Sequence, residues 1–256
     1  MGLWVVSGGR RFSEGSSMMQ ALADAITSVI LAPCCACCAR PLDHPTRGAV
    51  CSACWSSLSL ATGPLCEICG DALPTWRHVD TIARCARCRR SSRIISLGRS
   101  IGPYEGTLRD LLRALKYEGR RSLAKPLATH MAAAGADVLH GADAVVPVPL
   151  HFYRHYSRGF NQAAELARHL GVPSIHALRR TRATVTQTDL PEARRHANVH
   201  DAFAVCGRIP PGSVLVVVDD VSTTGATVDA CARVLLAAGA REVRGLSAAR
   251  AAARLP

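Results

Sequence analysis

The chain has 256 residues, of which 48% are hydrophobic, enough for one substantial core plus a small accessory module. Its formal charge of +12 comes almost wholly from arginine, since the only lysines are Lys116 and Lys125. That balance suits an anionic ligand or nucleic acid, but the basic residues are scattered and few aromatic residues lie near them. The pattern therefore favours a solvated surface over a dedicated nucleic-acid face.

Residues 1–33 are predicted to form a flexible arm and a short helix. Residues 1–17 are rich in glycine and serine and have no periodic apolar face, so we expect little order there. Apolar residues then recur at helical spacing from Gln20 to Ala32. A secretory signal ending at Cys34 is disfavoured, because Asp24 interrupts the apolar segment and a proline precedes the cysteine. The span is also too short to cross a membrane. We therefore expect a cytoplasmic protein without stable membrane insertion.

Cysteine spacing predicts a zinc-binding module at residues 34–92, which hold ten of the twelve cysteines. Two C-x-x-C pairs can place four thiolates around one tetrahedral zinc ion. The segment has little apolar core of its own, so metal would supply much of its folding free energy, on the order of 10 kcal/mol for a structural zinc site. Sequential pairing gives one site from Cys35, Cys38, Cys51 and Cys54, and a second from Cys66, Cys69, Cys85 and Cys88.

The first cluster reads CCACC and offers two choices of ligand. We favour Cys35 and Cys38, because they keep the C-x-x-C-x-x-P spacing to Pro41 that double zinc ribbons show; Cys34 and Cys37 are the alternative. A disulfide framework is disfavoured in a reducing cytoplasm, whereas an iron–sulfur cluster stays open because cysteine-only ligation suits it too. Four-thiolate zinc is the favoured interpretation, with one or both sites filled.

An α/β domain is predicted over residues 93–256. It begins with a strand from Arg99 to Tyr104 and a helix from Thr107 to Tyr117, whose leucines recur at helical spacing. Lys116 lies near the end of this helix and by default is a surface lysine. A second helix is predicted from Ser122 to about Ala134.

The next strand lies within residues 143–150, DAVVPVPL, and the turn Pro147-Val148-Pro149 stops it. A turn at the carboxyl end of a strand is where open α/β sheets place ligands. Arg154, Arg158 and an RGFNQ stretch precede a helix from Ala163 to Leu170. Arginine and amide side chains at a helix start suit a polyphosphate, but a capped helix with solvated arginines is nearly as good an interpretation.

Residues 180–200 are polar, rich in arginine and poor in apolar periodicity. Loops of this length are usually functional or disordered. A strand then follows to Val205.

The strongest signal lies at residues 214–227, VLVVVDDVSTTGAT. The apolar run from Val214 to Val218 predicts a strand buried on both faces, and a helical pattern resumes after Gly225. Asp219 and Asp220 therefore stand at the carboxyl end of this strand. The loop between them and the helix brings together hydroxyls, backbone N–H groups and the positive end of a helix dipole, which suits a phosphate monoester.

A carboxylate pair beside that loop would repel a bare anion, so the ligand should also offer hydroxyls or a bound divalent cation. A ribose 5-phosphate meets both requirements. No G-x-G-x-x-G opens the loop and the chain has no G-K-[ST], which argues against Rossmann and P-loop sites. A last strand is predicted from Glu242 to Ala249.

Several motifs occur in one order: the double cysteine ribbon, Tyr104, Lys116, PVPL, RGFNQ, RTRATVTQ, R-x-x-N and VDDVSTTGAT. Over roughly residues 20–250 they resemble the ComF/GntX family of competence-associated type I phosphoribosyltransferases. The resemblance implies a parallel sheet flanked by helices, preceded by a small double zinc-ribbon domain. It also implies phosphoribosyl pyrophosphate (PRPP) as ligand with magnesium, and a link to cytosolic handling of incoming single-stranded DNA, with competence or recombination proteins as partners. The acceptor is not set by these motifs.

The resemblance further implies roles for individual residues, with residues 180–200 as a mobile lid that excludes water. Catalytic roles fall on Asp219, Asp220, Arg158 and Lys116. PRPP contacts fall on Asp219, Asp220, Ser222, Thr223, Thr224, Gly225, Ala226, Thr227, Pro147, Val148 and Pro149. Lid and pyrophosphate contacts fall on Arg154, Arg182, Gln187, Arg195 and Asn198.

Two other classes of function compete with ribosyl transfer. The first is a catalytically silent protein that binds single-stranded DNA, since zinc ribbons are common in nucleic-acid proteins and the chain is basic. The second is a regulator that senses PRPP. A steep salt dependence of DNA affinity would favour the former, and pyrophosphate release with a candidate base would favour transfer.

Overall fold

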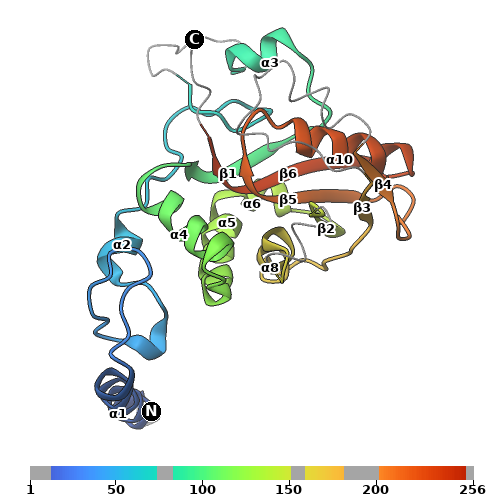
Figure 1. The fold of residues 1–256 in the computed structure, drawn as a ribbon. Helices are drawn as coiled ribbons and strands as arrows, with labels where there is room; N and C mark the ends of the chain where they lie inside the picture. Colours follow the sequence, from blue (N-terminus) through green and yellow to red (C-terminus); the bar gives the residue numbers. More distant parts are fainter. Residues whose placement is uncertain (1–12, 74–82, 151–158, 182–201, 252–256) are drawn as a thin grey trace, which may run out of the picture. The chain divides into compact units, whose positions relative to one another are not determined.

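A computed structural model describes residues 13–73, 83–150, 159–181 and 202–251 (Figure 1). The chain divides into two compact units, Met1–Ser57 and Leu58–Pro256. The division falls inside the predicted zinc module, so the second cysteine cluster belongs to the C-terminal unit. The predicted limits at residues 33 and 92 remain predictions.

The N-terminal unit contains helix α1 (Ser13–Leu31), the 3₁₀ turn η1 (Pro45–Arg47) and the short helix α2 (Ser52–Ser56). Helix α1 begins before the predicted start at Gln20. Its buried Asp24 joins it to η1, because the carboxylate accepts bonds from the Thr46 backbone N–H (2.9 Å) and hydroxyl (2.6 Å). Among the described residues, no helix has the length and apolar character that crossing a membrane requires.

The two cysteine clusters are built on the same backbone turn. In each, the first cysteine N–H donates to a carbonyl five residues on: Cys35 to Arg40 (2.8 Å) and Cys66 to Asp71 (2.7 Å). The residue after the second cysteine is left-handed in both turns, with φ of +57° at Ala39 and +72° at Gly70. Each later C-x-x-C pair opens a five-residue helix, α2 in the first cluster and α3 (Ala86–Arg90) in the second.

The C-terminal unit is organised around a four-stranded parallel sheet in the order β1-β6-β5-β2. Its strands are β1 (Gly98–Pro103), β2 (Ala144–Pro147), β5 (Val214–Ser222) and β6 (Glu242–Arg250). A separate antiparallel pair consists of β3 (Leu178–Arg180) and β4 (Phe203–Val205).

Helices flank the sheet on both faces, with α5 and α8 on one side and α10 on the other (Figure 1). The helices of this unit after α3 are α4 (Gly106–Tyr117), the 3₁₀ turn η2 (Arg121–Leu123), α5 (Ala124–Ala134), α6 (Ala136–Leu139), α8 (Gln162–Ala167) and α10 (Ala226–Ala237). The leucines of α4 that recur at helical spacing are fully buried, as their pattern predicts.

Strand β5 is the buried centre of the sheet. Val214 to Val218 are at most 2% exposed, which explains the unbroken β-branched run in the sequence. The register pairs Val218 with Pro147, so β2 ends where the acidic pair of β5 begins. The predicted fold class, a parallel sheet flanked by helices and preceded by cysteine clusters of zinc-ribbon type, is confirmed.

Candidate functional site

The acidic pair and the loop of the TTG motif lie at the carboxyl edge of the sheet. Asp219 and Asp220 are half-buried on β5, which continues to Ser222 because its pairing with β6 continues to Arg250. The turn into α10 passes through Gly225 at φ +81°, a left-handed conformation that glycine adopts without steric cost. The structure therefore contains the strand, turn and helix that the sequence predicts here.

Lys116 reaches this edge from the last turn of α4. Its Nζ lies 2.6 Å from Oδ2 of Asp220, and the two side chains are 22% and 16% exposed. Burial raises the pKa of the Asp220 carboxyl, but Lys116 more than offsets this effect, so the net shift is downward. The pKa of Lys116 is raised in turn by the same carboxylate against the opposing effect of burial. Lys116 is thus not a solvated surface lysine.

The pKa of Asp219 is displaced in the opposite direction. Burial and the neighbouring charge of Asp220 raise its pKa well above the ordinary value of 3.8. Its carboxylate accepts the backbone N–H of Asp220 at 2.9 Å. The two adjacent acids therefore have pKa values displaced in opposite directions, an arrangement that is frequent at functional sites. Tyr104 lies near the same charged side chains. Burial raises the pKa of its phenol, and the nearby Lys116 offsets only part of this rise.

The hydroxyls of the loop do not all face outward. Thr224 is 3% exposed, and its Oγ1 accepts the backbone N–H of Ala226 at 3.3 Å, so its hydroxyl shapes the turn. Ser222 is also buried. Thr223 and Thr227 are half-buried, and their side chains are the better candidates for direct phosphate contact.

The predicted turn after β2 lies at the same edge of the sheet. Pro147 and Val148 are buried and Pro149 is half-buried. The Val148 N–H donates to the carbonyl of Val218 at 2.9 Å, which fixes the turn beside the start of the acidic pair. Asn161 holds it from the other side: its Nδ2 donates to the Val148 carbonyl, and its Oδ1 caps α8 at Ala163 N–H, both at 3.0 Å.

Six predicted residues lie outside the described part of the chain. They are the catalytic candidate Arg158 and the lid and pyrophosphate candidates Arg154, Arg182, Gln187, Arg195 and Asn198. Their roles therefore stay predictions.

Two arginines that the sequence did not single out contact the loop. Arg87 lies within the Cys85–Cys88 pair, and its Nη1 donates to the Thr223 carbonyl at 3.1 Å. Arg93 has a side chain only 3% exposed, and its Nη1 donates to the Thr224 carbonyl at 2.7 Å. In the sequence both look like surface arginines of a basic chain, and no local pattern indicates their partners more than 130 residues away.

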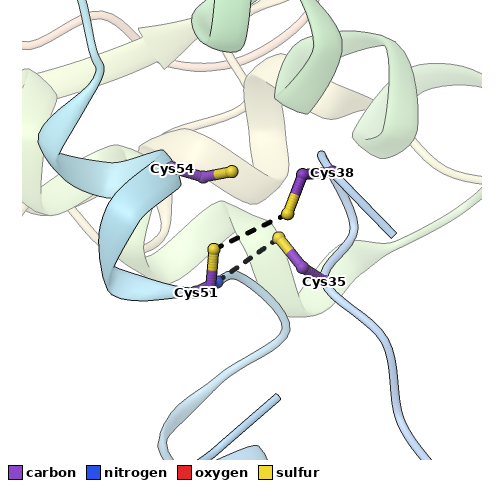
Figure 2. Close-up of side chains that lie close together, drawn as sticks. All are labelled: Cys35, Cys38, Cys51 and Cys54. Carbon is purple, nitrogen blue, oxygen red and sulfur yellow. Dashed lines mark hydrogen bonds between the residues drawn. The ribbon is translucent and has the colours of Figure 1, made fainter. Parts of the chain in front are cut away.

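The first cysteine cluster brings together the four favoured ligands (Figure 2). The Sγ atoms of Cys35, Cys38, Cys51 and Cys54 all lie within 4.8 Å of one another. The Cys38 and Cys51 sulfurs are 3.7 Å apart, and the Cys51 N–H donates to the Cys35 sulfur at 3.4 Å. Arg40 lowers the pKa of the Cys38 thiol to about 6, which favours the thiolate that zinc requires. Exposed Cys34 stays outside this group.

The second cluster is more deeply enclosed. Cys66, Cys69, Cys85 and Cys88 are all buried, and their sulfurs also lie within 4.8 Å of one another. A hydrogen bond from Cys69 is the largest cause that lowers the pKa of the Cys66 thiol to about 4. Both clusters therefore have the donor set and the compactness of a four-thiolate zinc site, as predicted.

The sequence has clear relatives. Competence protein F from Haemophilus influenzae is 29% identical over 222 residues, covering 81% of this chain and 93% of that protein. DNA utilization protein YhgH from Escherichia coli K12 is 34% identical over 223 residues, covering 81% and 92%. Competence protein ComFC from Bacillus subtilis is 29% identical over 203 residues, covering 74% and 79%. No protein-family model matches the chain.

Solved structures show partial likeness. The allosteric regulatory enzyme of purine biosynthesis aligns with a TM-score of 0.35 at 21% identity, over 59% of this chain and 31% of that one, so the chain spans about a third of its length. A hypoxanthine phosphoribosyltransferase from Staphylococcus aureus aligns with a TM-score of 0.32 at 10% identity, over 53% and 68%. At these TM-scores neither likeness supports an inference about function.

Proposed function

Because the chain belongs to the ComF family, we propose that it is a phosphoribosyltransferase that acts in the use of DNA by the cell. In this proposal it binds PRPP at the carboxyl edge of β5 and transfers the ribosyl 5-phosphate group to an acceptor. The names of its relatives, competence and DNA utilization proteins, support the cellular setting.

One observation carries the proposal: two half-buried carboxylates and a phosphate-type loop at the start of a helix lie on the same strand–turn–helix unit. Asp219 and Asp220 follow the buried run of β5 at residues 214–218, and the loop from Thr223 begins after Val221 and Ser222. The helix that starts there, α10, is twelve residues long and presents its positive end to the loop. A ligand with vicinal hydroxyls and a phosphate a few ångströms away, such as ribose 5-phosphate, matches this arrangement.

Each residue type has a definite task in this mechanism. The hydroxyls of Thr223 and Thr227 and the backbone N–H groups of the loop would hold the 5-phosphate. Asp219 and Asp220 would accept bonds from the ribose hydroxyls. Their carboxylates are also hard oxygen donors that suit Mg²⁺, which would neutralise charge on the pyrophosphate when bound. Lys116 would compensate the negative charge of Asp220 while no ligand is bound, through the contact between their side chains.

Transfer breaks the bond between C1 of the ribose and the pyrophosphate oxygen, and the bonding electrons leave with pyrophosphate. The nucleophile of the acceptor forms the new bond to C1 and loses its proton to solvent or to a base. Positive charge develops on the ribose in between, so the protein has to orient the sugar and stabilise the departing anion. In this proposal the loop and the acidic pair orient the sugar.

Calorimetry with PRPP and Mg²⁺ tests the binding step on the full zinc-loaded chain. Asp220→Asn and Thr224→Ala should each weaken PRPP binding at least about tenfold, the first by removing a charged acceptor and the second by loosening the turn. Asp110→Asn is the matched control, because Asp110 is a half-buried acid of α4, away from the loop in sequence and paired with its neighbour Arg109. Unchanged binding in both site variants would refute the assignment.

Transfer itself is tested by pyrophosphate release across nucleobases and amines, with and without single-stranded DNA. Release with one acceptor class supports transfer and names that class. PRPP binding without release from any acceptor would replace the transferase with a PRPP sensor. DNA binding with a steep salt dependence and no PRPP binding would favour the nucleic-acid protein instead.

A further inference from the structure

The second cysteine cluster is connected to the loop that would hold the phosphate. Arg87 and Arg93 donate to three successive carbonyls of that loop: Arg87 to Thr223 (3.1 Å), and Arg93 to Thr224 (2.7 Å) and Gly225 (3.3 Å). Arg87 lies within the second cluster and Arg93 lies just after its last cysteine, and the carbonyls that they bind are more than 130 residues later. The proposed transfer mechanism does not use them.

These bonds set the direction of the loop's N–H groups. In a planar trans peptide, the carbonyl of one residue and the N–H of the next point in opposite directions. Arginines that hold the carbonyls of Thr223 and Thr224 therefore turn the N–H groups of Thr224 and Gly225 toward the opposite side of the loop. Donors that are fixed in advance bind an anion more tightly, because binding does not have to order them.

Arg93 is part of the packing under the loop. Its Nε pairs with Asp229 of α10 at 2.8 Å, and the same carboxylate accepts the Ile94 N–H at 3.2 Å. A Cβ atom at Gly225 would collide with the Arg93 guanidinium, so the left-handed turn closes directly over it. The position of this arginine is therefore fixed from both α10 and the loop.

Arg87 depends on the cysteine cluster for its position. It lies on α3, a helix of five residues that would not be stable alone in water. The helix is held by its cysteines: the Cys85 sulfur caps the Cys88 N–H at 3.5 Å and lies 3.6 Å from the Cys69 sulfur. Four thiolates around a metal ion would lock this geometry, and loss of the ion would release it.

A third arginine fastens the other half of the cluster to the sheet. Arg250, at the end of β6, donates from Nη1 to the Cys69 carbonyl at 3.1 Å and pairs with Asp71. It stands beside Ser222 in the sheet register, one residue before the loop. The cluster is therefore connected to the phosphate edge at two points, through α3 and through the turn at Cys69.

We propose that the second cysteine cluster, acting through Arg87 beside the fixed Arg93, holds the Thr223–Gly225 loop in its anion-binding form, so that metal loading of this cluster sets the affinity for PRPP. The inference rests on the proposed function for its ligand. Arg87 and Arg93 are positioning residues in this scheme, because they contact the back of the loop. The first cluster, in the N-terminal unit, has no part in it.

The decisive variant is Arg87→Met in the zinc-loaded full chain. PRPP affinity by calorimetry should fall about tenfold, while zinc content and unfolding temperature stay at the wild-type values. Arg87→Lys should recover part of the loss. Arg89→Met is the matched control, because Arg89 is an exposed arginine on the same short helix. Wild-type PRPP affinity in Arg87→Met would overturn the proposal.

Hydrogen exchange gives a readout that does not need PRPP. Exchange at the amides of residues 224–227 should quicken in Cys88→Ser, which removes one ligand of the second cluster, and stay unchanged in Cys54→Ser, which removes one ligand of the first. Arg87→Met should quicken the same amides with zinc still bound. If wild-type protein binds no PRPP but these amides respond as stated, the proposed function fails and the coupling stands. If the amides respond equally to both cysteine variants, the coupling fails.

Discussion

Replacing Lys116 by methionine tests whether the ion pair at the carboxyl edge stabilises the fold. The change keeps the length and apolar stem of the side chain and removes the charge that lies 2.6 Å from Asp220. Asp220 would then face Asp219 without a counter-ion. The pKa of Asp220 should therefore rise from its lowered value, since burial disfavours its charged form and the ammonium that offsets this effect is gone.

The expected loss follows from the exposure of the two side chains. Solvent-exposed pairs contribute about 0–1 kcal/mol, whereas breaking a fully buried pair costs about 3–5 kcal/mol. Lys116 and Asp220 are 22% and 16% exposed, between these limits and nearer the buried one. We expect Lys116→Met to lower the free energy of unfolding at pH 7 by about 2 kcal/mol.

The pH dependence gives this prediction its sign. Asp220 has a lowered pKa in the folded state, so the stability from its pairing is present above the unfolded value of about 3.8 and is lost as the pH falls through the folded pKa. The difference between wild type and Lys116→Met in urea unfolding should therefore close at acidic pH. Lys125→Met, at the exposed and only other lysine, is the control. A difference no larger than that of the control, or one independent of pH, would refute the reasoning.

Three further predictions concern Asp219 and the two cysteine turns. Binding of PRPP with Mg²⁺ should tighten as the pH rises through the raised pKa of Asp219 and level off above it, because cation and hydroxyls prefer the ionised acid; calorimetry on Asp219→Asn should show no such rise. Ala39→Gly should stabilise the first cluster against a zinc chelator by about 1 kcal/mol, because φ is +57° there. Gly70→Ala should weaken the second cluster, since its Cβ would lie 2.7 Å from the Gly98 carbonyl oxygen; wild-type chelator resistance in both variants would contradict these two expectations.

Local pattern was sufficient for the elements around β5. The β-branched run, the acidic pair and the glycine before a helical pattern fix the order of strand, turn and helix, and the structure confirms each one. The same is true of the first cluster, where the spacing to Pro41 selected the two cysteines that do converge. In these cases the information lies within a few neighbouring residues. The sequence predicted the end of this strand too early, at Val218. The last residues of β5 extend the strand because they pair with β6, and they have no strand pattern of their own.

The partners of single charged residues could not be predicted in the same way. Lys116 and Asp220 are 104 residues apart, and Arg93 reaches a carbonyl 131 residues later. Such contacts depend on the order of the strands in the sheet, which cannot be predicted from the spacing of charged residues in the sequence. Thr224 shows the same limit at short range: its type suits a phosphate ligand, but packing turns its hydroxyl toward the backbone of Ala226.

The paired Lys116 also explains how the acidic edge can fold before any ligand is bound. Two adjacent half-buried acids that are both charged would destabilise the fold. Here an ammonium compensates one of them, while the pKa of the other is raised. A single ammonium can compensate only one of them. A ligand that brings a divalent cation can satisfy both, so its arrival should lower the pKa of Asp219 and free Lys116 for the anionic side of the ligand. In this view the ion pair is the resting form of a site for a metal-bound polyanion.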